Sequence, residues 1–387
     1  MLRLVLGGEL AGHRSYQDAL ADASTEPFAC QPRAKDMLYS SGTTVRPKGV
    51  KAPLPGCQVE EGGEALLGLF GPMYGLGADT VYLSPAPLYH AAPLRFCGMV
   101  HQVGGTVVSM PRFEPSAALQ AIEQYHVSHS QWVPTMFVRL LKLPESERTR
   151  YDLSSHRVAV HAAAPCPVEV KQRMIGWWGP ILQEYYAATE AIGVTLIDSP
   201  TWMQRSGSVG RAGLGTLRIC GEDGIELPTG EVGLVYFERE EFPFAYHKDP
   251  AKTEGARHPD HPTWATTGDM GYVDEDGYLY LTDRLAFMII SGGVNIYPQE
   301  IEDALTLHPA VLDLAVVGLP DDEMGEQVRG VVQPAPGVSP GPELEAQLLE
   351  FLRARIAHYK VPRRIDFVES LPRTATGKLQ KHKIRAS

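Results

Sequence analysis

Short apolar runs alternate with helix-like stretches between residues 104 and 190, and this alternation limits the fold more than any other feature. The runs typical of strands are "GGTVVSM" (104–110), "HSQWVP" (129–134), "RVAVHAAAP" (157–165) and "ILQEYYAATE" (181–190). The stretches typical of helices are "PSAALQAIEQYHV" (115–127), "TMFVRLLKL" (135–143) and "VEVKQRMIGWWG" (168–179). Strands separated by helices predict parallel βαβ units, so we expect a layered α/β sheet with functional loops at its strand ends.

The pattern of strand-like, helix-like and turn-forming stretches changes near Gly207 and again after Arg284. From Gly207 onward, β-rich runs are cut by Gly-Glu-Asp-Gly and Pro-Thr-Gly turns, which predicts antiparallel hairpins in a small β subdomain. Beyond Arg284, helix-like and strand-like stretches form a second compact group. We therefore predict an α/β fold: a large N-terminal domain of layered βαβ sheets with the β subdomain (1–284), then a small α+β C-terminal domain (285–387).

Composition excludes several classes of function. The 387 residues suffice for two domains, and 35 Lys plus Arg against 46 Asp plus Glu leave a net charge of −11. Such a surface repels nucleic acid and anionic lipid, so neither is an expected partner. The five cysteines lack a CxxC or Cys/His grouping, which argues against disulfides and a zinc site. No apolar run approaches a membrane span, and we expect a cytoplasmic protein.

The segment Met37–Val50, "MLYSSGTTVRPKGV", is unusually rich in hydrogen-bond donors. In a core strand its hydroxyls and cations would be buried without partners, and Gly42 and Pro47 break a helix, so we interpret it as a loop. Glycine-rich loops with Ser, Thr and Lys bind phosphate through N–H groups, hydroxyls and an ammonium. Phosphate binding is therefore favoured over an ordinary surface loop, although Gly49 follows Lys48 where a Walker motif has Ser or Thr.

At these residues the chain resembles the adenylate-forming superfamily, which includes acyl-CoA synthetases, peptide-synthetase adenylation domains and firefly luciferase. The family's phosphate loop reads Ser/Thr-Ser/Thr-Gly-Thr-Thr-Gly-x-Pro-Lys-Gly-Val, and Ser40–Val50 matches it at every place but one. Four further motifs follow in the family's order. The resemblance implies that the residues of this loop that bind ATP are Ser40, Ser41, Gly42, Thr43, Thr44 and Lys48.

Three of the later motifs imply further nucleotide contacts. "YYAATE" resembles the motif in which an aromatic ring stacks on adenine, a Thr meets the α-phosphate and a Glu holds Mg²⁺, here Tyr186, Thr189 and Glu190. "TTGDMGYVDEDGYL" resembles the segment whose Asp, here Asp269, accepts hydrogen bonds from both ribose hydroxyls. "TDRLAFMIISGGVNIYPQEIE" resembles the segment that joins the two domains, so Arg284 is expected to reach ribose or phosphate.

The same resemblance implies the remaining site residues. Gly292 and Gly293 let the backbone approach the pantetheine arm of CoA. In "LPRTATGKLQKHKIR", Lys378 is the catalytic lysine that bridges carboxylate and α-phosphate oxygens during adenylation. "SPAPLYHAAP" makes His90 a wall or gate between the acyl pocket and the CoA channel, and "HAAAPCP" puts Ala164 in the loop beside adenine. In isolation, each motif has an ordinary alternative as a turn, a helix start or a solvated basic tail.

The resemblance implies a reaction in two halves that uses ATP, Mg²⁺ and CoA. A carboxylate attacks the α-phosphate of ATP, pyrophosphate leaves and an acyl-adenylate forms, while Mg²⁺ and Lys378 neutralise phosphate charge. The mobile C-terminal cap domain then swings about a hinge at Ala286, so that a thiol, usually that of CoA, can attack. The apolar stretches Ala162–Ala164 and "FVRLLKL" favour an apolar or bulky carboxylic acid as the substrate.

The chain departs from the family pattern at several places. Val45 stands where the phosphate loop has Gly, and a β-branched residue resists positive φ, so we expect weakened adenylation but retained transfer of a supplied acyl-adenylate. Ala187, Asp283 and Ala286 replace the usual residues of the adenine motif and the hinge. The portion before the phosphate loop is shorter than is usual in the family, and apolar faces left uncovered there would favour self-association, for example as a homodimer.

Three functions remain open from the sequence. The first is an ATP-dependent acid:CoA ligase, that is, an acyl-CoA synthetase. The second is an adenylating enzyme that loads the phosphopantetheine of a carrier protein. Free CoA would not accelerate the turnover of such an enzyme. The third is an adenylation-impaired or inactive fragment that keeps only thioester transfer or binding. An inactive binding module would show no ATP-dependent rise in melting temperature, because a ligand stabilises only a folded state that binds it.

Overall fold

The structure is a computed structural model that describes residues 2–40, 48–61, 65–373 and 379–385. The chain divides into two units, one formed by residues 1–35 with 54–63 and the other by residues 36–53 with 64–387. In the first unit, β1 (Leu4–Val5) pairs in parallel with β2 (Arg14–Ser15), and the Ser15 side chain caps helix α1 (Tyr16–Ala21). The second unit holds all the site residues that the sequence predicts.

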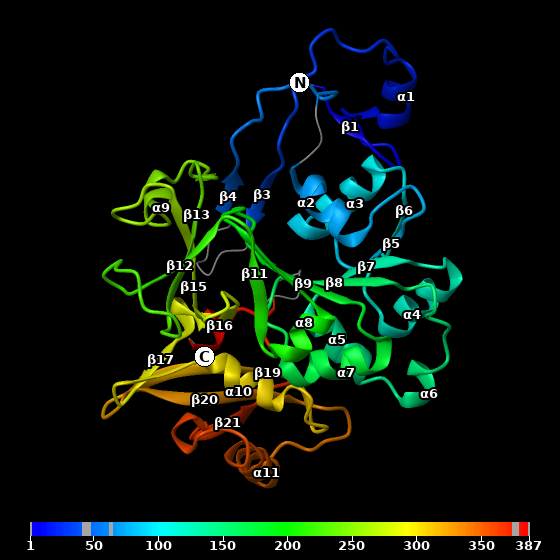
Figure 1. The fold of residues 1–387 in the computed structure, drawn as a ribbon. Helices are drawn as coiled ribbons and strands as arrows, with labels where there is room; N and C mark the ends of the chain where they lie inside the picture. The colour runs from blue at the N-terminus through cyan, green and yellow to red at the C-terminus, as the bar shows by residue number, and fades with distance from the viewer. Residues whose placement is uncertain (1, 41–47, 62–64, 374–378, 386–387) are drawn as a thin grey trace. The chain divides into compact units, whose positions relative to one another are not determined.

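A long mixed sheet is the main feature of the second unit (Figure 1). Its parallel strands are β5 (Val81–Ser84), β6 (Thr106–Ser109), β7 (His129–Trp132), β8 (Val158–His161) and β9 (Leu182–Ala187). Its antiparallel strands are β10 (Val194–Asp198), β11 (Ser208–Leu214), β12 (Thr216–Cys220), β13 (Gly233–Glu238), β15 (Trp264–Val273) and β16 (Leu279–Arg284). In the order β12-β13-β15-β16-β11-β10-β9-β8-β7-β5-β6, the two groups meet where β10 pairs antiparallel with β9. The predicted parallel part and the predicted antiparallel part are both confirmed.

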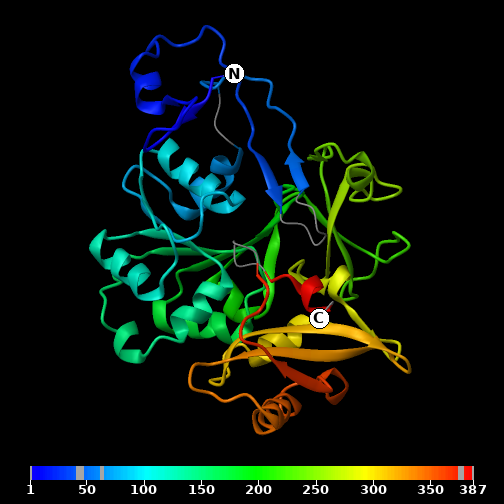
Figure 2. The same ribbon diagram turned by 180° about the vertical axis from the view of Figure 1, so that it is seen from behind.

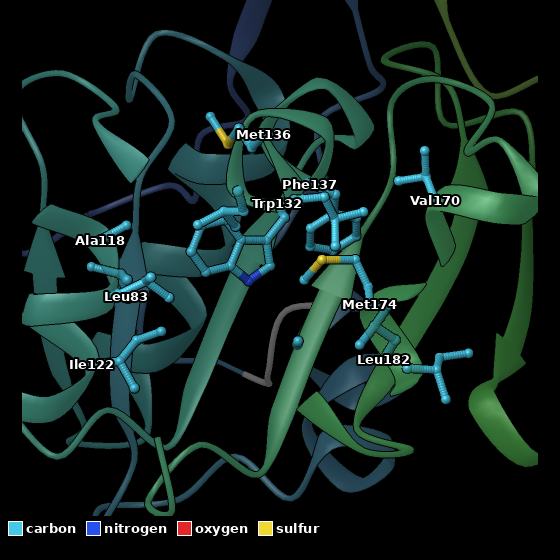
Figure 3. Packing of buried hydrophobic residues seen from close by; sticks show 14 of the residues in the cluster. Leu83, Ala118, Ile122, Trp132, Met136, Phe137, Val170, Met174 and Leu182 are labelled. Atoms are coloured by element: carbon cyan, nitrogen blue, oxygen red, sulfur yellow. The ribbon is translucent and has the colours of Figure 1, made fainter. Parts of the chain in front are cut away.

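Helices cover both faces of the parallel strands (Figures 1 and 2). On one face lie α2 (Ala65–Tyr74) and α3 (Ala91–Gln102). On the other lie α4 (Pro115–Gln124), α5 (Pro134–Leu141), α7 (Val168–Trp178) and α8 (Ser199–Gln204), with the short α6 (Glu145–Arg148) nearby in sequence. Figure 3 shows Trp132, Phe137 and Met174 packed in this second layer. Among the described residues, no helix is both long and apolar enough to cross a bilayer.

The interpretation of Met37–Val50 as a loop is wrong at both ends. There β3 (Met37–Ser40) and β4 (Lys48–Lys51) form an antiparallel ribbon, and β14 (Ala245–Tyr246), which precedes α9 (Pro250–Glu254), pairs with the free edge of β4. A strand turns successive side chains to opposite faces, so the ribbon buries Val50 without burying every polar neighbour. Residues 41–47, which hold most of the predicted phosphate loop, lie outside the described residues.

A separate sheet forms the small C-terminal domain. Its strands are β17 (Ile289–Ser291), β18 (Val294–Ile296), β19 (Val311–Asp321), β20 (Gly325–Pro334) and β21 (Arg364–Phe367). Its helices are α10 (Pro298–Leu305), α11 (Pro342–Arg353) and α12 (Lys381–Arg385), with the 3-10 turns η1 (Leu285–Phe287) and η2 (His358–Lys360). Ile301, Val316 and Leu348 belong to its own apolar core. The predicted small α+β C-terminal domain is confirmed, whereas the boundary between residues 284 and 285 stays a prediction.

A buried ion pair ties β9 to α7 inside the larger domain. The Nζ of Lys171 lies 2.5 Å from Oε2 of Glu184, and the two side chains are 0% and 4% exposed. Nε2 of His161, on β8, lies 3.7 Å from the same carboxylate oxygen, and burial lowers the pKa of this imidazole well below its usual range. Burial raises the pKa of Glu184, although the charge of Lys171 opposes that shift. The charged form of Glu184 therefore depends on Lys171.

Replacing Lys171 with Met should destabilise the protein by about 3–5 kcal/mol, because Glu184 would remain as a buried charge without a counterion. Replacing both residues, Lys171→Met with Glu184→Leu, should recover most of this loss. Urea denaturation followed by circular dichroism measures both. The matched control is Arg173→Met on the same helix, where the exposed Arg173–Glu169 pair at 3.8 Å is expected to contribute less than about 0.5 kcal/mol. A double variant no more stable than Lys171→Met would show that the unpaired carboxylate is not the cause of the loss.

Candidate active site

Asp269 on β15 accepts hydrogen bonds from three different side chains. The hydroxyls of Tyr186 and Thr267 each donate to Oδ2 at 2.8 Å, and Nε of Arg284 donates to Oδ1 at 2.9 Å. The residue is only 8% exposed. Donors on both oxygens hold the carboxylate in one orientation, as a group that must present itself to a ligand requires.

Strand pairing explains why Arg284 meets Asp269. The two residues are direct partners in the antiparallel ladder of β15 and β16, so their side chains lie on the same face of the sheet. Burial by itself lowers the pKa of Arg284, but the charge of Asp269 and the phenol of Tyr186 reverse this and raise it. Burial, followed by the charge of Asp269, raises the pKa of Tyr186 well above its usual range. The tyrosine is therefore a permanent hydrogen-bond donor in this cluster.

A second polar cluster joins Glu190, Tyr246 and Lys48. The hydroxyl of Tyr246 donates to Oε1 of Glu190 at 2.8 Å. The ammonium of Lys48 lies over the Tyr246 ring, 4.9 Å from its centroid, within the range of a cation–π contact. Glu190 follows β9 in a turn, whereas Lys48 begins β4 and Tyr246 ends β14. The pairing of β4 with β14 thus brings two distant segments to the same carboxylate.

The two clusters share one electrostatic environment. Burial is the largest cause that lowers the pKa of Lys48, the charges of Lys252 and Arg284 lower it further, and the charge of Glu190 opposes the shift. The charge of Glu190 also acts on Arg284. Lys48, Glu190, Asp269 and Arg284, predicted from four separate motifs, are therefore brought together in one region of the structure.

The predicted CoA-binding and hinge residues follow directly after this region in the chain. Gly292 and Gly293 form the two-residue turn of the hairpin of β17 and β18, and their φ angles of 58° and 78° are those that such a turn favours in glycine. Ala286 lies within η1, which begins immediately after Arg284. Asp283 accepts from the backbone N–H of Arg284 at 2.7 Å and from that of Gln299 at 3.2 Å, so it connects the end of β16 to α10.

Other predicted site residues stand apart from these contacts. His90 is the N-cap of α3, where burial lowers the pKa of its imidazole, so the ring is neutral near pH 7. Thr189 lies in the turn beside Glu190, and Ala164 is exposed in the loop after β8. Within the described residues, none of these three makes a hydrogen bond to the Asp269 or Glu190 cluster through its side chain.

Several predicted residues lie outside the described part of the chain. They are Ser41, Gly42, Thr43, Thr44 and Lys378. The backbone of Ser40 pairs with Lys48 at the open end of the β3–β4 ribbon. On either side of residues 374–378, Arg373 forms ion pairs with Asp313 at 2.7 Å, and Lys381 pairs with Glu302 at 2.7 Å.

Sequence reasoning missed Thr267 and Tyr246. Thr267 could have been found, because it lies two residues before Asp269 in "TTGD" and a Thr hydroxyl commonly bonds a neighbouring Asp. No comparable signal marks Tyr246 in "FPFAYHKDP", since its contacts depend on the pairing of β14 with β4.

The residues at Glu190 fit a magnesium ion. Mg²⁺ prefers hard oxygen ligands and is usually held by one or two carboxylates together with substrate phosphates and water. Glu190 offers such a carboxylate, 8% exposed, with one oxygen already oriented by Tyr246. Among the described residues, no group of three or more His, Cys, Asp or Glu side chains is placed to hold a metal ion.

Comparison with known proteins finds family models and solved structures that match most of the chain. The family described as AMP-binding enzyme matches residues 8–241, and the AMP-binding enzyme C-terminal domain matches residues 300–378. Feruloyl-CoA synthase of an Amycolatopsis species is 35% identical over 351 residues, which are 90% of this chain and 69% of that protein. Two solved structures are similar over most of the chain. ATP-bound MatB from Rhodopseudomonas palustris has a TM-score of 0.79 and 30% identity, with coverage of 96% and 72%. The amide bond synthetase McbA from Marinactinospora thermotolerans has a TM-score of 0.74 and 33% identity, with coverage of 89% and 68%.

The hairpin turn generates a prediction about stability. Gly293→Ala should lower the free energy of unfolding by about 1–2 kcal/mol, because alanine is strained at the left-handed φ of this position. No steric clash adds to this cost, since no atom lies within 4 Å of the added Cβ. Gly292→Ala should reduce the free energy of unfolding only slightly more, since its Cβ would lie 2.4 Å from Cε of Met324, the far end of a flexible side chain that can shift. In a Met324→Ala background, the cost of Gly292→Ala should fall to that of Gly293→Ala. Chemical denaturation measures the free energy of unfolding of Gly293→Ala, Gly292→Ala, Met324→Ala and the double variant Gly292→Ala with Met324→Ala. If Gly292→Ala and Gly293→Ala lower it equally in the native background, Met324 moves aside without cost.

Proposed function

The chain belongs to the AMP-binding enzyme family, and from this premise we propose that it is an ATP-dependent acid:CoA ligase that works through an acyl-adenylate. The observation that carries the proposal is the meeting of Lys48, Glu190, Asp269 and Arg284 in one electrostatic environment. Two cations and two carboxylates with fixed orientations suit a ligand that has both a polyphosphate and a sugar with hydroxyl groups.

We assign the nucleotide to these residues as follows. Asp269 accepts hydrogen bonds from the ribose hydroxyls, and Arg284, held on Asp269 at 2.9 Å, reaches ribose or phosphate. The Tyr186 ring, anchored through its hydroxyl, stacks on adenine. Lys48, at the end of the phosphate loop, faces the β- and γ-phosphates, and Thr189 meets the α-phosphate. Glu190 would hold Mg²⁺, which would supply positive charge to the phosphates for the attack of the substrate carboxylate on the α-phosphate.

The two halves of the reaction use different parts of the chain. Lys378 acts in adenylation by placing a positive charge where negative charge develops on the α-phosphate and the carboxylate. The C-terminal domain, which has its own apolar core, then turns about the η1 segment at Ala286 and brings the Gly292–Gly293 turn toward the thiol. His90, neutral near pH 7, separates the acyl pocket from the path of the thiol without placing a charge beside an apolar acyl group.

The substrate class and the acceptor are inferred from the sequence and from the similar proteins. We propose an apolar or bulky carboxylic acid, in line with the aromatic acyl group in the name of the similar feruloyl-CoA synthase. The acceptor is CoA, with a carrier-protein phosphopantetheine as the alternative, and an amine is tested because one similar structure is an amide bond synthetase. An inactive or transfer-only protein is the remaining alternative.

A coupled pyrophosphate assay over a panel of acids, with and without CoA, holo carrier protein or an amine, tests this function. Pyrophosphate release that requires ATP and an acid, and a thioester that requires CoA, are the expected results. Asp269→Asn should raise the KM for ATP by about 10- to 100-fold, because hydrogen bonds to a charged group are lost. Asp274→Asn is the matched control on the same hairpin, where the carboxylate pairs with Arg205 at 3.0 Å. No pyrophosphate with any acid, together with no ATP-dependent rise in melting temperature, would reject the proposal.

Val45 predicts a difference between the two half-reactions. Val45→Gly should increase the rate of pyrophosphate release, because glycine restores the conformational freedom that the phosphate-loop pattern has at this place. The rate of thioester formation from a supplied synthetic acyl-adenylate should not change, since that step uses no triphosphate. The two rates are measured separately on the native protein and the variant. If pyrophosphate release is already fast and does not respond to Val45→Gly, the expectation of impaired adenylation is wrong.

A further inference from the structure

Tyr246 contacts two of the proposed nucleotide-binding residues, although no role in the reaction has been assigned to it. Its hydroxyl donates to Oε1 of Glu190 at 2.8 Å, and its ring supports the ammonium of Lys48 at 4.9 Å from the centroid. Tyr246 is 7% exposed and Glu190 8% exposed. A buried residue that contacts both an anionic and a cationic group of one site can set the distance between them.

The hydrogen bond between Tyr246 and Glu190 has a fixed direction. The phenolic O–H of Tyr246 is the donor at 2.8 Å, and the carboxylate oxygen Oε1 of Glu190 is the acceptor. Outer hydrogen bonds of this kind orient a metal-binding carboxylate and typically contribute 10- to 100-fold to metal affinity.

The ring of Tyr246 is held so that it cannot turn away from Lys48. Its backbone pairs with Val50 in the β14–β4 ladder, and its N–H donates to Oγ1 of Thr253 at 2.9 Å. Phe244 packs edge-on against the ring at 5.0 Å. Val50, Phe244 and Tyr246 belong to one buried apolar cluster. The face of the Tyr246 ring thus supports the ammonium of Lys48. Lys48 lies on β4, the strand that pairs with β14, which carries Tyr246.

We infer that Tyr246 is a positioning residue of the nucleotide site: its hydroxyl orients Glu190 toward Mg²⁺ and its ring places Lys48 on the same polyphosphate. The inference rests on the proposed function, because it requires that the site binds ATP with Mg²⁺. It separates two contributions of one side chain. The hydroxyl acts on the carboxylate and hence on Mg²⁺, whereas the ring acts on the ammonium and hence on the phosphates directly.

Two variants of Tyr246 test this division. Binding of an ATP analogue with a methylene group in place of the α,β-bridging oxygen is measured by calorimetry over a range of Mg²⁺ concentrations. Tyr246→Phe removes only the hydroxyl, and should raise the Mg²⁺ concentration for half-maximal binding by about 10- to 100-fold while affinity at saturating Mg²⁺ stays nearly unchanged. Tyr246→Leu also removes the ring, and should weaken analogue binding about fivefold even at saturating Mg²⁺.

Tyr82→Phe is the matched control. Tyr82 is buried, and its hydroxyl lies 3.4 Å from Oε1 of Gln131, so the variant loses a comparable group in a different part of the domain. Its Mg²⁺ dependence should equal that of the native protein. In the double variant Glu190→Gln with Tyr246→Phe, the Mg²⁺ concentration for half-maximal binding should be no higher than in Glu190→Gln alone. The reason is that the Tyr246 hydroxyl acts through the Glu190 carboxylate.

The outcomes separate the inference from the function on which it rests. If the native protein binds the analogue with Mg²⁺ and Tyr246→Phe changes only the melting temperature, Tyr246 is a purely structural residue and the inference is overturned while the proposed function stands. If the native protein shows no Mg²⁺-dependent binding, both fail together. A shift in Mg²⁺ dependence for Tyr246→Phe, absent in Tyr82→Phe, supports the inference.

Discussion

The pairing of β15 with β16 is the constraint on which the candidate site depends. It sets Asp269 opposite Arg284 on one face of the sheet, at the point where β16 ends and the chain enters η1 and the C-terminal domain. The same ladder therefore supplies a carboxylate–guanidinium pair immediately before the η1 segment. A register slip of one residue in β16 would turn Arg284 to the face opposite Asp269, so this ion pair depends on the backbone hydrogen bonds of the β15–β16 ladder.

Charge balance makes this arrangement tolerable in a half-buried region. Burying a charge is costly unless it is paired, and here Arg284 is paired with Asp269 while the charge of Glu190 favours the charged form of Lys48. Tyr246 adds a neutral group that satisfies one carboxylate oxygen and supports the ammonium at the same time. The four charged residues therefore balance one another.

The core beneath the site is anchored by charge as well as by apolar packing. Glu184 and Tyr186 are two residues apart on β9, so their side chains project to the same face of the strand. Lys171 on α7 fixes Glu184 at 2.5 Å, and Asp269 fixes the hydroxyl of Tyr186 at 2.8 Å. The strand that supplies the proposed adenine contact is thus held from the helix layer at one position and from the antiparallel strands at another.

The sequence by itself determined the α/β class, the order of helices and parallel strands and the family motifs, because hydrophobic periodicity and short motifs are properties of neighbouring residues. Only the tertiary structure decided that both ends of Met37–Val50 are strands, since β4 acquires its second partner, β14, from a distant part of the chain. For the same reason the motif residues Glu190 and Asp269 could be predicted, but their partners Tyr246 and Arg284 could not be matched to them. Which hydrogen bonds form between distant segments depends on strand order and register, and neither is encoded in any short stretch of sequence.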